Sequence, residues 1–150
     1  MAWLETHQGL WTHRKTLDLA SALGLSETYT VAHLIRLWHW GLDNATPDGD
    51  LLGLLPERVS NILTRAADFH GDPDTFYQAL RSAGWIEDSP TLPNTVRFHD
   101  FYDYAGKYLE RKVEKRDQMR RRRLSADTSQ DVASNNLTRN GNVSPVQEKR

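Results

Sequence analysis

The segment from Ser26 to Leu52 places the strongest constraint on the fold, because it predicts one long helix with a broad apolar face. The residues on that face recur at the helical period and are Val31, Leu34, Ile35, Trp38, Gly41 and Leu42. Ser26 is the expected N-cap, and Pro47-Asp48-Gly49 is expected to end the helix in a turn. A helix with so wide an apolar face must be covered, so we expect the surrounding chain to form one small domain around it.

Three shorter helices are predicted from the start and stop signals at their ends. They cover residues 13–23, 56–67 and 73–83. In the first of them, Leu17, Ala20 and Leu23 share the apolar face. In the last, Asp72 is the expected N-cap and Pro73 occupies the first helical position.

Short strands are predicted at 50–54, from Trp85, and at 96–99. Behind an extra N-terminal helix, the order is then helix, strand, helix, helix, strand, loop, strand. This is the order of a winged helix-turn-helix, in which residues 88–95 form the wing. The sequence therefore predicts a mainly α fold with a small β part (α+β): a winged helix-turn-helix with an added N-terminal helix.

Charge divides the chain into three parts. Residues 1–105 hold 14 acidic and 7 basic side chains, residues 106–123 hold 3 acidic and 9 basic, and residues 124–150 hold 3 of each. A last helix is expected to begin near Phe101 and to continue as the basic segment. We predict a winged-helix domain over 1–105, a basic helical arm over 106–123, and a disordered tail over 124–150, since the tail is polar and lacks aromatic residues.

The cations of the basic arm are the main candidates for contact with DNA. They are Arg111, Lys112, Lys115, Arg116, Arg120, Arg121, Arg122 and Arg123. Side chains that neutralise phosphates give binding that tolerates any base sequence and weakens steeply with salt. Two other interpretations are open, namely a solvated helix face and an arm that folds onto an acidic surface of its own or a neighbouring subunit.

Two further candidates, Gln78 and Arg81, lie on the predicted helix 73–83. In a helix-turn-helix the later helix enters the major groove, where Gln can bind adenine and Arg can bind guanine or phosphate. Asp72 and Asp74 at the leading end of this helix would repel phosphates. The alternative is that the helix forms one wall of the core and part of a protein–protein surface.

Arg14 and Lys15 are an anomaly, because the positive end of the helix dipole disfavours cations in a first turn. One interpretation pairs them with carboxylates such as Asp18, Asp100 or Asp103. The other makes them phosphate contacts.

Several classes of function have no support in the sequence. There is no cysteine, no histidine pair at zinc-ligand spacing, no glycine-rich phosphate loop and no long apolar run. His99 and Asp100 are expected to hydrogen bond to one another, with Asp100 capping the last helix, and not to perform acid–base chemistry. We therefore predict no enzyme activity, no catalytic residues, no cofactor, no metal and no membrane span, and a cytoplasmic location.

Segments spread over residues 3–108 carry a resemblance to a known family. They are HRKTLDLASALGL, VAHLIRLWHWGLDNATPDGDL, FYQALRSAGWIE and VRFHDFYDYAGKY. They resemble the N-terminal winged-helix module of phage replication-initiation or replisome-organiser proteins, including the DnaD-like group. The resemblance implies DNA binding or self-association by the module. Where that family usually has a second domain that contacts origin DNA or a helicase, this chain continues as the basic arm.

Together these features predict a non-enzymatic DNA-binding protein of phage or prophage DNA replication, whose arm contacts phosphates. The expected partners are DNA, a replicative helicase or other replication proteins, and a second copy of the chain. One alternative is a winged-helix transcriptional regulator. Another is an interaction adaptor without DNA affinity.

Overall fold

The structure is a computed structural model, and it describes residues 6–139. Its main elements, in chain order, are α1 (Arg14–Leu23), α2 (Glu27–Asn44), α3 (Val59–Ala66), α4 (Pro73–Ser82), β1 (Ile86–Asp88), β2 (Val96–Phe98) and α5 (Lys107–Arg139). Short 3-10 helices precede α1 and α3, at Gln8–Thr12 and Pro56–Arg58. The prediction of a mainly α fold with a small sheet is confirmed.

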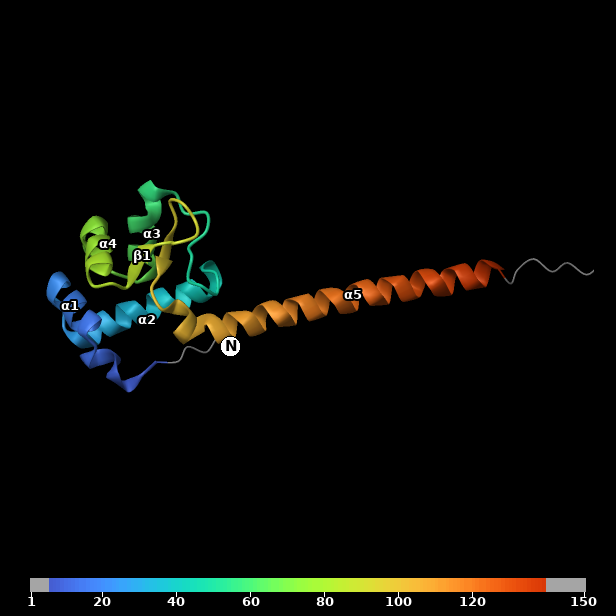
Figure 1. The fold of residues 1–150 in the computed structure, drawn as a ribbon, viewed down its shortest axis with the longest axis horizontal. Coiled ribbons are helices and arrows are strands. Elements are labelled where there is room, and N and C mark those ends of the chain that lie inside the picture. The colour runs from blue at the N-terminus through green and yellow to red at the C-terminus, as the bar shows by residue number, and fades with distance from the viewer. Residues whose placement is uncertain (1–5, 140–150) are drawn as a thin grey trace, which may run out of the picture. The chain divides into compact units, whose positions relative to one another are not determined.

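The chain divides into two units, Met1–Arg111 and Lys112–Arg150. In the first unit, α2 runs along one side, with α3, α4 and the two strands packed over it and α1 against its first turns (Figure 1). Helix α5 begins in the first unit and continues into the second. None of the helices within residues 6–139 is long and apolar enough to cross a membrane.

The helix boundaries follow from local chemistry at the predicted capping residues. The Ser26 hydroxyl accepts a hydrogen bond from the backbone N–H of Tyr29 at 3.4 Å, and this satisfies a free donor at the start of α2. The Asp72 carboxylate does the same for α4, accepting from Thr75 N–H at 2.8 Å. Gly24 adopts the left-handed conformation that ends α1, with φ of 64°. The two predicted N-caps, Ser26 and Asp72, are confirmed.

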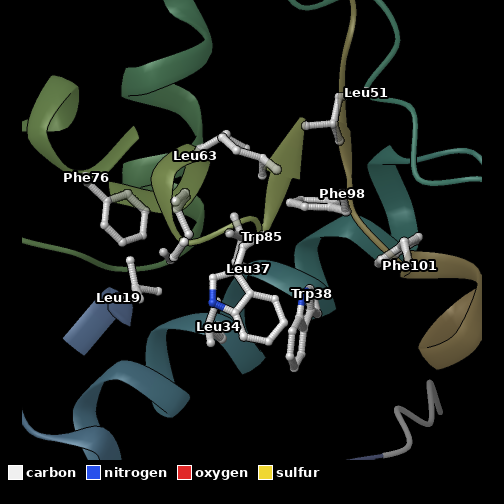
Figure 2. Packing of buried hydrophobic residues seen from close by; sticks show 14 of the residues in the cluster. Leu19, Leu34, Leu37, Trp38, Leu51, Leu63, Phe76, Trp85, Phe98 and Phe101 are labelled. Atoms are coloured by element: carbon white, nitrogen blue, oxygen red, sulfur yellow. The ribbon is translucent and has the colours of Figure 1, made fainter. Parts of the chain in front are cut away.

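The core forms on the predicted face of α2, where Leu34, Trp38 and Leu42 are almost completely buried. Figure 2 shows this face meeting side chains from α1, α4 and the strands. On α1 the predicted apolar face is wrong in one respect, because Leu17 is 43% exposed and Leu19 is completely buried. Helix α1 is therefore rotated relative to the prediction, since it packs against both α2 and α4.

The sheet consists of β1 paired antiparallel with β2, with Ile86 opposite Phe98. The strand predicted at 50–54 is not formed; its residues make only isolated bridges, between Asp50 and Arg97 and between Leu51 and Ala45. Glycines with positive φ, at positions 49 and 53, flank the bridged residues and bend the segment. Two backbone hydrogen bonds still join the segment to β2, from Leu51 N–H to the Val96 carbonyl at 2.9 Å and from Phe98 N–H to the Gly49 carbonyl at 3.0 Å.

A first prediction concerns Gly49, which holds φ at 93° and touches the end of β2. A Cβ atom added there would lie 2.6 Å from the carbonyl oxygen of Phe98 and 2.8 Å from Cβ of Phe101. We expect Gly49→Ala to lower the free energy of unfolding by about 2–3 kcal/mol, since strain in the left-handed region adds to a clash with backbone. Urea unfolding followed by circular dichroism measures the loss.

Gly53 is the matched control for this prediction. It also has positive φ, at 74°, but a Cβ atom added there meets nothing within 4 Å. We expect Gly53→Ala to cost only the conformational strain, about 1 kcal/mol. Equal losses in the two variants would mean that the close approach of Gly49 to Phe98 contributes nothing.

The region around the last helix departs from the prediction at both ends. A π-helical turn, Tyr102–Gly106, precedes α5 where a regular α-helix was expected. The disordered tail predicted from residue 124 is instead helical as far as Arg139. No glycine or proline occurs between Gly106 and Gly141, so the sequence has no residue that stops a helix in this stretch. The remainder of the predicted tail, 140–150, lies outside the described residues.

Candidate nucleic-acid interface

Arg14 and Lys15, in the first turn of α1, both lie close to carboxylates. Arg14 Nε is 3.7 Å from Asp18, one turn along the same helix, and Lys15 Nζ is 3.7 Å from Asp100, which follows β2. These are the ion pairs of the first interpretation. The Arg14 side chain is 92% exposed, whereas that of Lys15 is 26% exposed and lies over the ring of Trp85. Lys15 therefore contributes to the packing of α1, and Arg14 remains open to solvent.

Arg81, near the end of α4, is held by two partners within the first unit. Its two terminal nitrogens donate to the two carboxylate oxygens of Asp88 at 2.8 and 2.9 Å, and one also donates to the Tyr77 hydroxyl at 3.1 Å. The hydrogen bond to Asp88 is the main cause that raises the pKa of Arg81, and the hydrogen bond to Tyr77 is the second. The guanidinium in turn lowers the pKa of Asp88. Arg81 thus ties α4 to β1, which the sequence analysis did not foresee.

The leading end of α4 is acidic. Asp72 accepts hydrogen bonds from the hydroxyl and the backbone N–H of Thr75, and these bonds lower its pKa and keep it charged. Asp74 and Gln78 are exposed and line a shallow depression beside Thr75. Of the two candidates on α4, Gln78 is therefore accessible, but carboxylates stand at the end of the helix that would approach phosphates.

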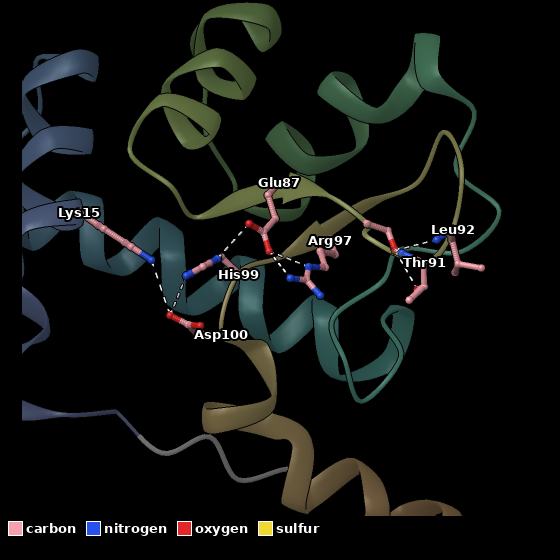
Figure 3. Close-up of polar contacts among 8 residues, drawn as sticks. Lys15, Glu87, Thr91, Leu92, Arg97, His99 and Asp100 are labelled. Atoms are coloured by element: carbon pink, nitrogen blue, oxygen red, sulfur yellow. Dashed lines mark hydrogen bonds and ion pairs between the residues drawn. The ribbon is translucent and has the colours of Figure 1, made fainter.

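The loop between the strands, 89–95, contains no lysine or arginine. It is ordered by Ser89, whose hydroxyl accepts from the N–H of Leu92 at 3.2 Å and from that of Thr91 at 3.4 Å (Figure 3). Leu92, in the middle of this loop, is 36% exposed. The predicted wing is thus neutral and partly apolar, with no cation that could bind a phosphate.

A chain of charged side chains links α1 to both strands through Glu87 (Figure 3). Arg97 Nε donates to Glu87 at 2.7 Å, and His99 Nδ1 lies 3.2 Å from the other Glu87 oxygen. The second ring nitrogen of His99 is 3.0 Å from Asp100, which also pairs with Lys15. The predicted contact between His99 and Asp100 is confirmed. The predicted cap is wrong, because Asp100 has φ of 55° and its side chain faces His99 and Lys15.

A second prediction follows from the pKa of Glu87. Burial raises this pKa, but hydrogen bonds and charge from Arg97 and His99 outweigh burial and hold it below its usual value of 4.5. The charged carboxylate therefore stabilises the fold above that pH, and the contribution is lost as the pH falls through the lowered pKa. Since the side chain is 36% exposed, we expect Glu87→Gln to cost about 1 kcal/mol near neutral pH.

Urea unfolding of both proteins across a pH series tests this expectation. The difference between wild type and Glu87→Gln should shrink as the pH falls below 4.5. The other carboxylates titrate in both proteins, so their effects cancel in the difference. A difference that persists unchanged in strong acid would mean that the charge of Glu87 is not the cause.

The eight candidate cations of the basic arm all lie on α5, and all of them are exposed. Arg111 is the last residue of the first unit, and the other seven belong to the second. This is the densest group of exposed cations within residues 6–125, for which side chains are described. Two further cations that were not predicted as contacts, Arg58 and Arg65, are exposed at the start of α3 and in its last turn.

The described residues contain no group of three or more His, Cys, Asp or Glu side chains in an arrangement that could hold a metal ion. Comparison of the sequence with protein-family models and with curated proteins, and of the structure with solved structures, found no match. The case for an interface therefore rests on the residues themselves. Exposed positive charge lies on α5, while α4 and the loop 89–95 present acidic or neutral surface.

Proposed function

We propose that this protein binds DNA without catalysing a reaction, through the exposed cations of the basic arm. One contrast supports the proposal. The cations of the first unit that lie nearest the predicted reading helix are engaged with carboxylates, as Arg81 is with Asp88 and Lys15 with Asp100. Those of α5 between Arg111 and Arg123 are all exposed on one helix. Such cations release the counterions condensed on phosphates, which is the source of sequence-tolerant affinity.

The first unit fits a winged helix-turn-helix with α1 as an additional N-terminal helix. In this interpretation α3 and α4 are the helix-turn-helix pair, β1 and β2 are the strands of the wing, and the loop 89–95 is its tip. We further propose, from the resemblance to phage replication-initiation modules, that the protein acts in phage or prophage DNA replication in the cytoplasm. A winged helix serves DNA or protein partners equally well, so this assignment rests on analogy.

A second candidate function is that of an interaction adaptor without DNA affinity. It is favoured by exposed leucines in the first unit, among them Leu52, Leu55 and Leu92, of which the first two are more than half exposed. Leu92 lies in the uncharged loop 89–95, and the other two lie in the segment before α3. Apolar side chains left in solvent are typical of surfaces that bind other proteins. In the DNA-binding proposal, the same leucines would contact a helicase, another replication protein or a second copy.

Binding of the full chain to a labelled DNA duplex across a salt series tests the proposal. With six or more phosphate contacts, the affinity should fall on the order of 10³-fold between about 50 and 200 mM salt. Absence of binding at the lowest salt would contradict it and favour the adaptor. A footprint at one defined sequence, lost on changing Gln78, would favour a transcriptional regulator that reads operator DNA with α4.

A further inference from the structure

We infer that the part of α5 from Lys112 to Arg123 lies in the major groove of duplex DNA and presents one defined face to it. This inference rests on the proposed function and goes beyond it, because it specifies the form of nucleic acid and the side of the helix. The supporting observation is that the charged side chains are distributed unevenly around the helix. The order of the residues along the sequence does not by itself show this distribution.

The cations of this segment gather on one side of the helix. With about 100° between successive residues, six of the seven project within an arc of about 160°; they are Lys112, Lys115, Arg116, Arg120, Arg122 and Arg123. The remaining arc holds the two acidic residues, Glu114 and Asp117, together with Arg121. All of these side chains are exposed. The segment is thus a helix with a basic face and a narrow acidic stripe.

The dimensions of the basic face fit the major groove. A helix with its side chains is about 10–12 Å wide and the groove is about 12 Å wide, so both phosphate walls come within reach. Lys115 and Arg122 lie at one edge of the arc and Arg116 and Arg120 at the other, so each edge would serve one wall. Lys112 and Arg123 lie between the edges and would face the floor of the groove. The acidic stripe would then point away from the DNA.

Three other polyanions fit this helix less well. Single-stranded nucleic acid is usually held by aromatic side chains that stack on bases, and no aromatic residue follows Tyr108. Duplex RNA has a deep and narrow major groove, which does not admit a helix. A membrane surface requires an apolar face opposite the charges, and Val113 and Met119 point in different directions. Duplex DNA is the form that matches width, charge and composition together.

The first part of the test compares nucleic acids at one salt concentration, using the full chain. The probes are a DNA duplex of about two helical turns, the RNA duplex of the same sequence, and one strand of the DNA. We expect the DNA duplex to bind at least about tenfold more tightly than the other two. Equal affinity for the two duplexes would overturn insertion into the groove, since charge alone favours neither.

The second part uses variants that keep the composition and the net charge. The double variant Glu114→Lys/Lys115→Glu exchanges two neighbouring residues. It moves a cation onto the acidic stripe and a carboxylate onto an edge of the basic face. The control, Glu114→Arg/Arg121→Glu, exchanges two residues that both lie on the stripe. We expect the first variant to bind the DNA duplex with an affinity about tenfold lower than that of wild type. Its logarithmic salt slope should be smaller by about one. The control should match wild type.

The outcomes separate this inference from the proposed function. If the first variant binds as well as wild type, while wild type still binds with a steep salt slope, DNA binding stands and the defined face does not. If wild type binds none of the nucleic acids, the proposed function fails as well. Binding only to vesicles with anionic lipid, or only to a second copy of the chain, would overturn both. Circular dichroism of each variant confirms that α5 keeps its helix content.

Discussion

Replacement of Lys115, Arg116, Arg120 and Arg122 together by glutamine is expected to weaken binding to duplex DNA on the order of 10³-fold at about 0.1 M salt. Each cation that neutralises a phosphate releases about 0.9 of a counterion, which is worth roughly a factor of eight at that salt concentration. Four independent contacts multiply to the expected loss, and the logarithmic salt slope should fall by about 3.6. Fluorescence anisotropy of a labelled duplex across a salt series measures both quantities.

Arg58→Gln/Arg65→Gln is the matched control, because it removes the two exposed cations of the α3 region from the first unit. If the basic arm supplies the affinity, this variant should bind within a few-fold of wild type. The opposite result, a large loss from the α3 variant and a small one from the arm variant, would move the DNA contact to α3. All six side chains are exposed, so neither variant should change the unfolding temperature by more than a few degrees.

Features that depend on a few neighbouring residues were predictable from the sequence. Ser26, Asp72 and Gly24 cap their helices because a side-chain oxygen can reach a free N–H three residues on, and because glycine adopts positive φ at little cost. The buried face of α2 was predictable for a related reason. Its apolar residues keep the helical period over many residues, so only one orientation buries Leu34 and Trp38 together.

Contacts that depend on tertiary packing were not predictable. Leu17 and Leu19 are both apolar, and the position of α1 between α2 and α4 decides that Leu19 is buried. Arg81 looked like a base-reading residue because it lies on α4. Its partner Asp88 lies beyond the turn at Gly84, so the pair forms only when β1 folds back beside the helix. Such a pair between α4 and β1 has no local pattern that would reveal it.

The candidate interface shows the same division. The sequence identified the cations of the basic arm because they are dense along the chain, and their exposure on α5 is consistent with that role. Charge counts along the chain do not show how the charges are distributed around the helix. Separation of the basic face from the acidic stripe appears only when Lys112–Arg123 is placed on a helix. Linear charge counts therefore identify the candidate cations but not the face of the helix on which they lie.

Trp85 contacts several elements of the first unit at once. It is 97% buried between α4 and β1, and its ring meets that of Trp38 edge to face at 5.4 Å (Figure 2). Its indole N–H donates to the backbone carbonyl of Lys15 at 3.2 Å, and the ring also contacts His13. One side chain thus joins α1, α2 and the start of the sheet.

Trp85→Ala is therefore expected to lower the free energy of unfolding by about 3–5 kcal/mol, because it leaves a large cavity and removes the indole hydrogen bond to the Lys15 carbonyl. Domains of this size are stable by only about 5–15 kcal/mol, so the variant should unfold at much lower urea concentration. Trp85→Phe keeps most of the ring and loses the hydrogen bond to Lys15, so we expect an intermediate loss. Tyr29→Ala removes an aromatic ring that is 66% exposed, and it should change stability by less than about 0.5 kcal/mol. If Trp85→Ala cost no more than Tyr29→Ala, the junction of α1, α2 and β1 would not be the stabilising centre of this fold.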